Sequence, residues 1–93
     1  MNELFSVKGK VVVITGGTGV LGGVIAEYLA GEGAKVVILG RKKDAGDAVV
    51  NKIKDQGNEA IFLQSDVLNK ESLIENRNEI LEKYGRLDAL INA

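Results

Sequence analysis

The sequence predicts an α/β protein in which a parallel sheet is covered by helices on both faces. Two observations lead to this prediction. Short apolar, β-branched runs alternate along the chain with longer segments whose apolar residues recur at helical spacing. Glycines separate many of these segments, and a stretch holding five of them, ITGGTGVLGG at residues 14–23, follows the first apolar run. Strands that alternate with helices favour parallel pairing, because parallel neighbours need a crossover connection.

The expected order of elements is β-α-β-α-β-α-β. The first strand, residues 10–15, is continuously apolar, which is typical of a strand buried on both faces. The other strands are expected over residues 35–39, 59–63 and 87–92. The helices are expected over residues 20–32, 43–56 and 69–84. Glycines that can adopt a left-handed cap conformation follow or end them, at Gly31 or Gly33, Gly57 and Gly85.

Helical spacing also predicts which side chains face the sheet. The first helix should bury a stripe made of Leu21, Val24, Ile25, Tyr28 and Leu29, with Tyr28 a core residue. The second helix should turn one side inward, made of Ala45, Ala48, Val49 and Ile53. Ser65 or Asn69 should cap the third helix, and Tyr84 should anchor its end.

Right-handed crossovers then give the strand order 3-2-1-4. This is the first half of a Rossmann-type doubly wound parallel sheet plus one strand, and so a partial sheet. A chain of 93 residues is one small domain, which we expect to span residues 1–93.

Composition excludes several classes of site. The chain has no cysteine and no histidine, which excludes disulfides, thiolate nucleophiles and Cys/His metal sites. A net charge of −1 gives no indication of a nucleic-acid or membrane partner. The first ten residues lack the apolar stretch of a secretion signal, and no apolar run approaches the roughly 20 residues needed to span a bilayer. We therefore expect a cytoplasmic protein.

The glycine-rich stretch has three interpretations. A triphosphate loop needs G-x-x-x-x-G-K-[ST], but Gly23 and Val24 stand where the lysine and hydroxyl residue belong, so this interpretation is set aside. A dinucleotide fingerprint, G-x-G-x-x-G between a strand and a helix, is matched by residues 17–22, whose middle glycine is Gly19. The following helix would direct its free N–H groups at the pyrophosphate. The third interpretation is a turn that binds nothing.

The ends of the next two strands bear on the cofactor. NAD-binding units place an acid at the end of the second strand, but this chain has Arg41 and Lys42 there, which can hold a 2′-phosphate. We therefore favour NADP(H) over NAD(H); the alternative is a pair of solvated charges at a helix start. After the third strand, Asp66 can accept a hydrogen bond from the adenine amino group or can cap a turn.

Together these features resemble the short-chain dehydrogenase/reductase family. The resemblance rests on residues 9–16, the glycine loop, residues 33–37, the triplet at 65–67 and the segment YGRLDALIN at 84–92. It implies that Gly16, Thr18, Val20 and Leu21 line the pyrophosphate and ribose. It further implies that Arg41 faces the adenosine ribose, Asp66 and Val67 the adenine, and Asn92 the cofactor's ribose side.

One departure from the family's usual pattern concerns the substrate. Most members carry T-G-x-x-x-G-x-G, but here the glycine falls one residue early, at Gly19, and Val20 takes its place. This spacing resembles the sugar-nucleotide branch of the family and a group of sugar-acid reductases of the D-mannonate oxidoreductase type. The resemblance to the second group extends to LFSVKGK, GVLGG and INA in this chain.

The family's catalytic centre has no counterpart in the chain. The resemblance implies that this centre moves a proton through a Tyr-x-x-x-Lys pair with a nearby serine. Four residues after Tyr28 and Tyr84 stand Glu32 and Asp88, so neither tyrosine begins such a pair. We assign no catalytic residue and expect the chain to stop before the catalytic region and to be inactive alone.

Three functions therefore stay open. The first is the NAD(P)(H)-binding N-terminal part of an oxidoreductase acting on a hydroxyl/carbonyl pair, such as that of a sugar acid. The second is a non-catalytic dinucleotide-binding module or truncated gene product, and the third is a fragment of a sugar-nucleotide epimerase or dehydratase. An incomplete sheet would expose its fourth strand and an apolar patch, so self-association is expected.

Overall fold

A computed structural model of the chain describes residues 6–16 and 18–93. Its four strands are β1 (Val11–Thr15), β2 (Lys35–Gly40), β3 (Ala60–Gln64) and β4 (Ala89–Asn92). Its three helices are α1 (Val20–Gly31), α2 (Lys43–Asp55) and α3 (Lys70–Tyr84). The expected order of elements is confirmed, and the bounds differ from the expected ones by one or two residues. No helix in the described part of the chain combines the length and the apolar character that a membrane span requires.

The four strands form one parallel sheet in the order β3-β2-β1-β4, which confirms the predicted topology. The register aligns the strands so that their carboxyl ends lie at one edge. Thr15, the last residue of β1, stands opposite Leu39 on one side and Asn92 on the other. Gly40, the last residue of β2, stands opposite Gln64 of β3.

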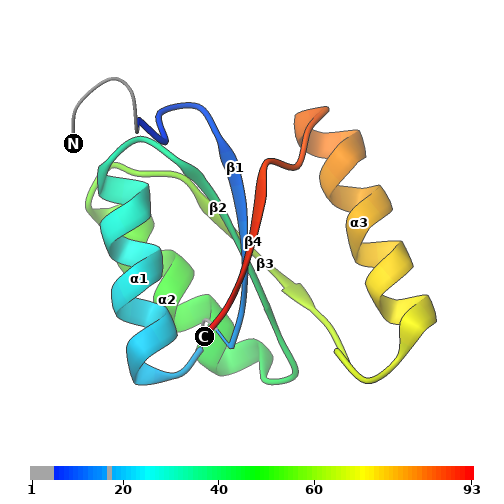
Figure 1. The fold of residues 1–93 in the computed structure, drawn as a ribbon. Coiled ribbons are helices and arrows are strands. Elements are labelled where there is room, and N and C mark those ends of the chain that lie inside the picture. The colour runs from blue at the N-terminus through cyan, green and yellow to red at the C-terminus, as the bar shows by residue number, and fades with distance from the viewer. Residues whose placement is uncertain (1–5, 17) are drawn as a thin grey trace.

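The helices cover the sheet unequally, as Figure 1 shows: α1 and α2 lie on one face and α3 lies alone on the other. The buried core is divided in the same way. On the face of α1 and α2 the buried side chains include Val12, Ile14, Val36, Ile38 and Ile53. On the face of α3 they are Val11, Val13, Val37, Leu39 and Ile80. Alternate residues of β1 enter the two cores, which confirms that the first strand is buried on both faces, and the structure shows the same for β2.

The predicted inner face of α1 is wrong in part. Leu21, Val24 and Tyr28 are 66%, 59% and 57% exposed, so Tyr28 is not a core residue. The helix instead turns its small residues to the sheet, where Gly22, Gly23, Ala26 and Ala30 are buried. Small side chains let the helix backbone approach the sheet closely, and the bulky residues on the neighbouring side then face solvent. Of the predicted stripe, Ile25 and Leu29 pack at the edge of the core.

The predicted inner side of α2 is also shifted. Ile53 is buried as expected, but Ala48 is exposed, and Gly46 and Val50 occupy the core side instead. A glycine on this side is explained by Phe62 of β3, whose ring lies where a side chain at position 46 would begin. The absence of a side chain at Gly46 therefore leaves room for the ring where α2 packs on β3.

The ends of the helices follow the predicted signals. The Asn69 side chain accepts a hydrogen bond from the Ser72 N–H (3.2 Å), so Asn69 is the cap of α3. Gly85 ends this helix with a φ of 74°, a left-handed conformation that glycine adopts without strain. Tyr84 packs against the core on the α3 face, as expected for an anchor.

Hydrogen bonds of Asp88, which the sequence did not reveal, join the start of β4 to β1. The carboxylate of Asp88 accepts a hydrogen bond from the Val11 N–H (2.8 Å), and the Asp88 N–H donates to the Val11 carbonyl (2.9 Å). Arg86 donates to the same carboxylate (2.8 Å), and these contacts keep the pKa of Asp88 below its usual range. The residue ahead of β4 thus fixes the register that brings Asn92 beside Thr15.

Candidate functional site

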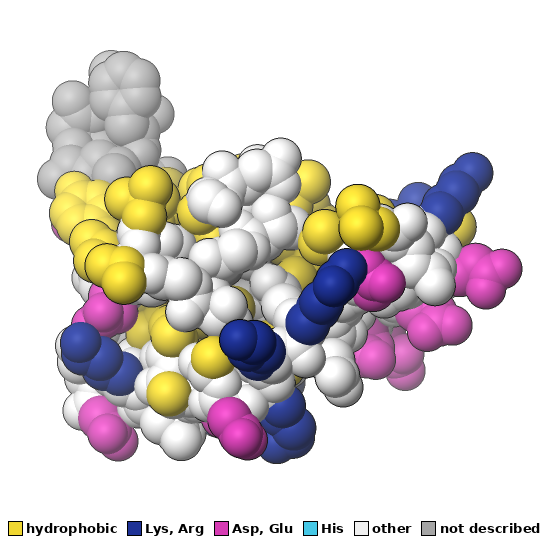
Figure 2. Space-filling view, turned by 90° about the horizontal axis from the view of Figure 1, so that it is seen from below, with side chains coloured by type: hydrophobic (Ala, Val, Ile, Leu, Met, Phe, Trp, Pro, Cys, Tyr) yellow, Lys and Arg dark blue, Asp and Glu magenta, His cyan; other side chains and the backbone are white. Residues whose placement is uncertain are grey.

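The residues predicted to bind a cofactor gather at the carboxyl edge of the sheet. Loops leave this edge after each strand, which is where parallel α/β sheets bind ligands. The strand order changes direction between β1 and β4, because the chain adds β2 and β3 on one side of β1 and then crosses over to add β4 on the other side. Figure 2 looks at this edge from below and shows Lys and Arg side chains near its middle, with Asp and Glu side chains gathered over α3.

The glycine loop after β1 is a tight turn. Gly16 has a φ of 73°, and the Gly19 N–H donates to the Gly16 carbonyl (3.1 Å). A Cβ atom at Gly16 would lie 2.5 Å from the Ala93 carbonyl oxygen, so the turn and the end of β4 approach each other closely. Gly17, the first glycine of the predicted fingerprint, lies outside the described residues.

The start of α1 is open toward this edge. Gly19 is its N-cap, with φ −80° and ψ 172°, and in the described residues no side chain caps the helix and no acid stands in its first turn. The first N–H groups of a helix have no partner within the helix and carry its positive dipole end. Val20 and Leu21, which begin the helix, are 90% and 66% exposed. The arrangement therefore offers N–H donors to an anion.

Arg41 and Asp66 meet at the ends of β2 and β3. An Arg41 Nη2 atom donates to Asp66 Oδ1 at 3.0 Å. The same oxygen accepts from the Leu68 N–H (3.0 Å), so Asp66 does cap a turn. The pKa of Asp66 is held below its usual range mainly by the hydrogen bond from the Leu68 backbone N–H, and also by the hydrogen bond from Arg41. Among the described residues none donates to Asp66 Oδ2, which leaves an acceptor at the edge of the sheet.

Two further predicted residues lie apart from this pair. Lys42 is exposed at the N-cap of α2, and it forms no ion pair within the described part of the chain. Val67 is 47% exposed and turns toward β1 and β4 rather than toward Arg41. The structure thus separates Asp66 and Val67, which are adjacent in sequence, into two parts of the edge.

Asn92 and Thr15 form the other part of the edge. The Thr15 hydroxyl donates to the Asn92 side-chain oxygen and lies 3.4 Å from the Ile91 carbonyl. The next residue, Ala93, donates its N–H to the Thr15 carbonyl (3.0 Å). The Asn92 side chain is therefore oriented by Thr15 of β1, and the residue is exposed.

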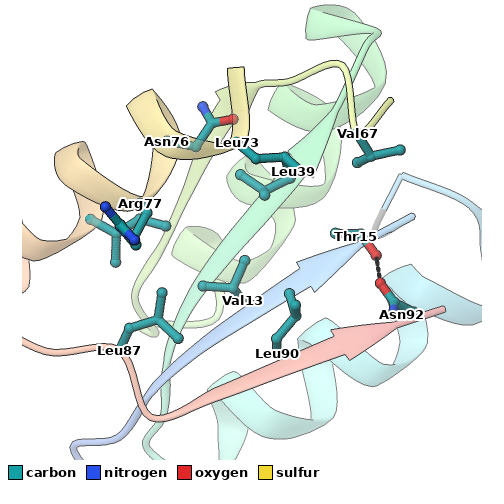
Figure 3. Close-up of a pocket in the computed structure, with 11 residues that line it drawn as sticks. Val13, Thr15, Leu39, Val67, Leu73, Asn76, Arg77, Leu87, Leu90 and Asn92 are labelled. Carbon is teal, nitrogen blue, oxygen red and sulfur yellow. Dashed lines mark hydrogen bonds between the residues drawn. The ribbon is translucent and has the colours of Figure 1, made fainter. Parts of the chain in front are cut away.

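A groove of about 340 Å³ runs from this point along β1 and β4 beneath α3 (Figure 3). Its walls are mostly apolar: Val13, Leu39, Leu73, Leu87 and Leu90 contribute, with Asn92 at one end. Leu90 is 59% exposed in it. The predicted apolar patch is thus present beside β4, on the face that α3 covers alone.

Two residues of the edge, Gly40 and Ser65, have structural roles that the sequence did not predict. Gly40 precedes Arg41, and a Cβ atom there would lie 3.1 Å from Thr18 Cγ2, so a glycine lets the loop after β1 rest on the end of β2. Ser65 is 3% exposed, and its hydroxyl has no hydrogen-bond partner in the described part of the chain. For Gly40, the available signal was a glycine directly before a basic residue at the end of a strand. For Ser65, nothing in the sequence indicated that the side chain is buried.

Comparison with known proteins agrees with this geometry. A family model described as short chain dehydrogenase matches residues 10–93. An uncharacterized oxidoreductase of Bacillus subtilis (strain 168), UxuB, is 44% identical over 87 residues, which is 94% of this chain and 31% of that protein. The chain thus spans about a third of the length of this relative.

Two solved structures illustrate the cofactors found among similar proteins. A metagenomic short-chain oxidoreductase in complex with NADP is 32% identical, with a TM-score of 0.87 over 91% of this chain and 38% of that one. A putative D-mannonate oxidoreductase from Haemophilus influenza with bound NAD is 33% identical, with a TM-score of 0.87 over 91% of this chain and 30% of that one. The family match, the relative and the Rossmann-type sheet agree, and the chain belongs to the short-chain dehydrogenase family of oxidoreductases.

Proposed function

We propose that this chain binds a nicotinamide dinucleotide along the carboxyl edge of its sheet, with NADP(H) preferred over NAD(H). The observation that carries the proposal is the open start of α1. A Cβ atom at Gly19 would meet only the Gly16 carbonyl oxygen, at 3.5 Å, so this glycine is not required by packing within the described residues. Its φ of −80° is also accessible to any residue. A glycine that the fold does not need is explained by the close approach of a ligand.

The same geometry fits a pyrophosphate. The uncapped N–H groups of the first turn of α1 supply donors, and the helix dipole favours negative charge at this point. Thr18, held against Gly40, closes the loop on the side of β2. Gly16, Thr18, Gly19, Val20 and Leu21 would thus surround the phosphates, and Asn92 would bind the ribose on the nicotinamide side.

The preference for NADP(H) rests on the cations beyond β2. Arg41 and Lys42 occupy the place where an acid would bind the 2′-hydroxyl of NAD. Both side chains are exposed, so a 2′-phosphate can reach them without displacing the core. Asp66 Oδ2 would accept a hydrogen bond from the adenine amino group, and Val67 would contact the ring.

We propose further that the whole protein acts on a hydroxyl/carbonyl pair, with a sugar acid as substrate. When bound, the dinucleotide supplies or accepts the hydride. Support for the sugar acid comes from the T-G-x-x-G-x-x-G spacing and from the similarity to the putative D-mannonate oxidoreductase. The 93 residues hold no Tyr-x-x-x-Lys, so we expect them to bind the cofactor without turning over a substrate. The expected location, the cytoplasm, stays a prediction.

A single methyl group tests the pyrophosphate site. Gly19→Ala adds a Cβ atom that the fold accommodates but that stands where the phosphates would approach. We expect calorimetric or fluorescence titration to show a loss of binding of at least tenfold for both NADPH and NADH. Gly31→Ala is the matched control, because its Cβ atom meets nothing within 4 Å at the other end of α1. Equal binding by the two variants, each folded by circular dichroism, would refute the site.

The cofactor preference is tested at the other end of the site. Arg41→Ala should weaken NADPH binding while leaving NADH binding nearly unchanged, because only NADPH carries the 2′-phosphate. The control is Lys54→Ala, which removes an equal charge from the last turn of α2. If Arg41→Ala left the ratio of the two affinities unchanged, the assignment of Arg41 to the 2′-phosphate would be wrong.

A further inference from the structure

The Arg41–Asp66 ion pair occupies the position where the proposed 2′-phosphate would bind. The two strand ends that carry it are tied together, because the Ser65 N–H donates to the Gly40 carbonyl (2.8 Å) and the Gln64 side chain donates to the Arg41 carbonyl (3.1 Å). Arg41 and Asp66 are therefore held close together by the hydrogen bonds between the ends of β2 and β3, without help from a ligand.

The two members of the pair are held with different firmness. Asp66 is fixed by its backbone surroundings: its carboxylate accepts from the Leu68 N–H, and its own N–H lies 3.2 Å from the Ser72 hydroxyl. The guanidinium of Arg41 has the Asp66 carboxylate as its hydrogen-bond partner within the described part of the chain, and its side chain is 65% exposed. A ligand can thus redirect Arg41, but the negative charge of Asp66 stays in place.

We propose that Asp66 is a specificity-determining residue that limits the preference for NADP(H) by competing with the 2′-phosphate for Arg41. The inference rests on the proposed dinucleotide site. An NADP(H) molecule must share the guanidinium with a fixed carboxylate and must place its own phosphate near that charge. An NAD(H) molecule brings a neutral ribose and can leave the ion pair intact. An exposed ion pair is weak, so the competition tunes the preference and does not block NADP(H).

The expected size follows from the charges. Two unit charges about 4 Å apart in water interact only weakly, so removing one of them should change an affinity by about fivefold. Asp66→Asn removes the charge and keeps an oxygen that can accept from the Leu68 N–H. The ratio of NADPH to NADH affinity should therefore rise by a factor of about three to ten. Both cofactors carry the same adenine, so a lost contact with its amino group drops out of this ratio.

The experiment measures both affinities for the full chain by titration at low and high salt. Asp55→Asn is the control, because it removes an equal charge from the last turn of α2. In an Arg41→Ala background the gain from Asp66→Asn should shrink, since no guanidinium is left to compete for. The gain should also shrink at high salt.

Distinct results separate the possible failures. If neither cofactor binds to the wild-type chain, the proposed function fails and this inference with it. If both bind but Asp66→Asn leaves their ratio unchanged, or the gain persists in full without Arg41, only the inference is overturned. Should the asparagine variant unfold, Asp66→Ser, whose hydroxyl can also accept from a nearby N–H, provides the same comparison.

Discussion

A glycine of α2 provides a quantitative test of how the helix layer packs on the sheet. Gly46 is buried against Phe62 of β3, and a Cβ atom at position 46 would overlap the ring. Alanine in a helix interior is favoured over glycine by up to about 1 kcal/mol. Overpacking a core costs about 1–3 kcal/mol, because rings and backbone must shift. Gly46→Ala should therefore lower the free energy of unfolding by about 1 kcal/mol, or the melting temperature by about 4–8 °C.

Two comparisons isolate the clash. Gly31→Ala places the same methyl group on an exposed helix end with nothing within 4 Å, so it should be neutral or stabilise by a few tenths of a kcal/mol. In a Phe62→Leu background the penalty at Gly46 should fall, because the flat ring that causes it is gone. Urea and thermal unfolding followed by circular dichroism measure all variants. A Gly46→Ala chain at least as stable as wild type, or an equal penalty in both backgrounds, would refute the reasoning.

Two other predictions concern ionisation and association. Burial of the phenol, with the negative charge of Glu59 nearby, raises the pKa of Tyr84 from 10.0 to about 12. Tyr28→Phe leaves Tyr84 as the one tyrosine of the chain, so its tyrosinate absorbance should appear near pH 12. Since the fold favours the neutral phenol, its contribution to stability is complete below pH 10 and is lost as the pH rises toward 12; a titration at the ordinary pKa would contradict this. Leu90→Lys places a charge in the apolar groove, so it should reduce self-association measured by sedimentation velocity. Leu68→Lys makes the same change at an exposed residue outside the groove, so it should leave self-association unchanged. Equal sedimentation of the two variants would contradict a role for the groove.

The order of the elements and the topology of the sheet could be predicted because their signals are local. Each strand is a short apolar run, each helix ends near a glycine, and the handedness of crossovers leaves one arrangement for the four strands. Residue type limited the cap of α3 to Ser65 or Asn69, and the structure shows that Asn69 is the cap. None of these inferences required knowledge of which side chain meets which.

The inner faces of α1 and α2 could not be predicted by the same means. Periodicity ranks residues by hydrophobicity, so it chose Leu21, Val24 and Tyr28 over the glycines and alanines beside them. The sheet selects by size instead, because a helix lying close above Val12 and Ile14 leaves no room for large side chains. Size also determines which residue faces the sheet at Gly46 of α2. The ring that requires a glycine there belongs to Phe62, which lies on a later strand and could not be identified from the spacing of residues in the helix.

The site shows a similar division. Residues at strand ends were identified from the sequence, since the topology brings every carboxyl end to one edge. The pairing of Arg41 with Asp66 was not, because it depends on the register between β2 and β3 and on how far each loop extends. The sequence showed that Arg41 and Asp66 carry opposite charges, but it did not show the distance between them. At 3.0 Å the two side chains form an ion pair, and a ligand that binds Arg41 must compete with Asp66.

The glycines of the loop illustrate why one residue type does not imply one role. Gly16 serves the fold, because its positive φ and its proximity to the Ala93 carbonyl both exclude a side chain. Gly22 is one of the small residues that α1 buries. Gly19 has ordinary dihedral angles, and a Cβ atom there would meet only the Gly16 carbonyl oxygen, at an ordinary contact distance of 3.5 Å. A methyl group should therefore destabilise the chain at Gly16 and leave it folded at Gly19, so only the second position can report on a bound phosphate without also reporting on stability.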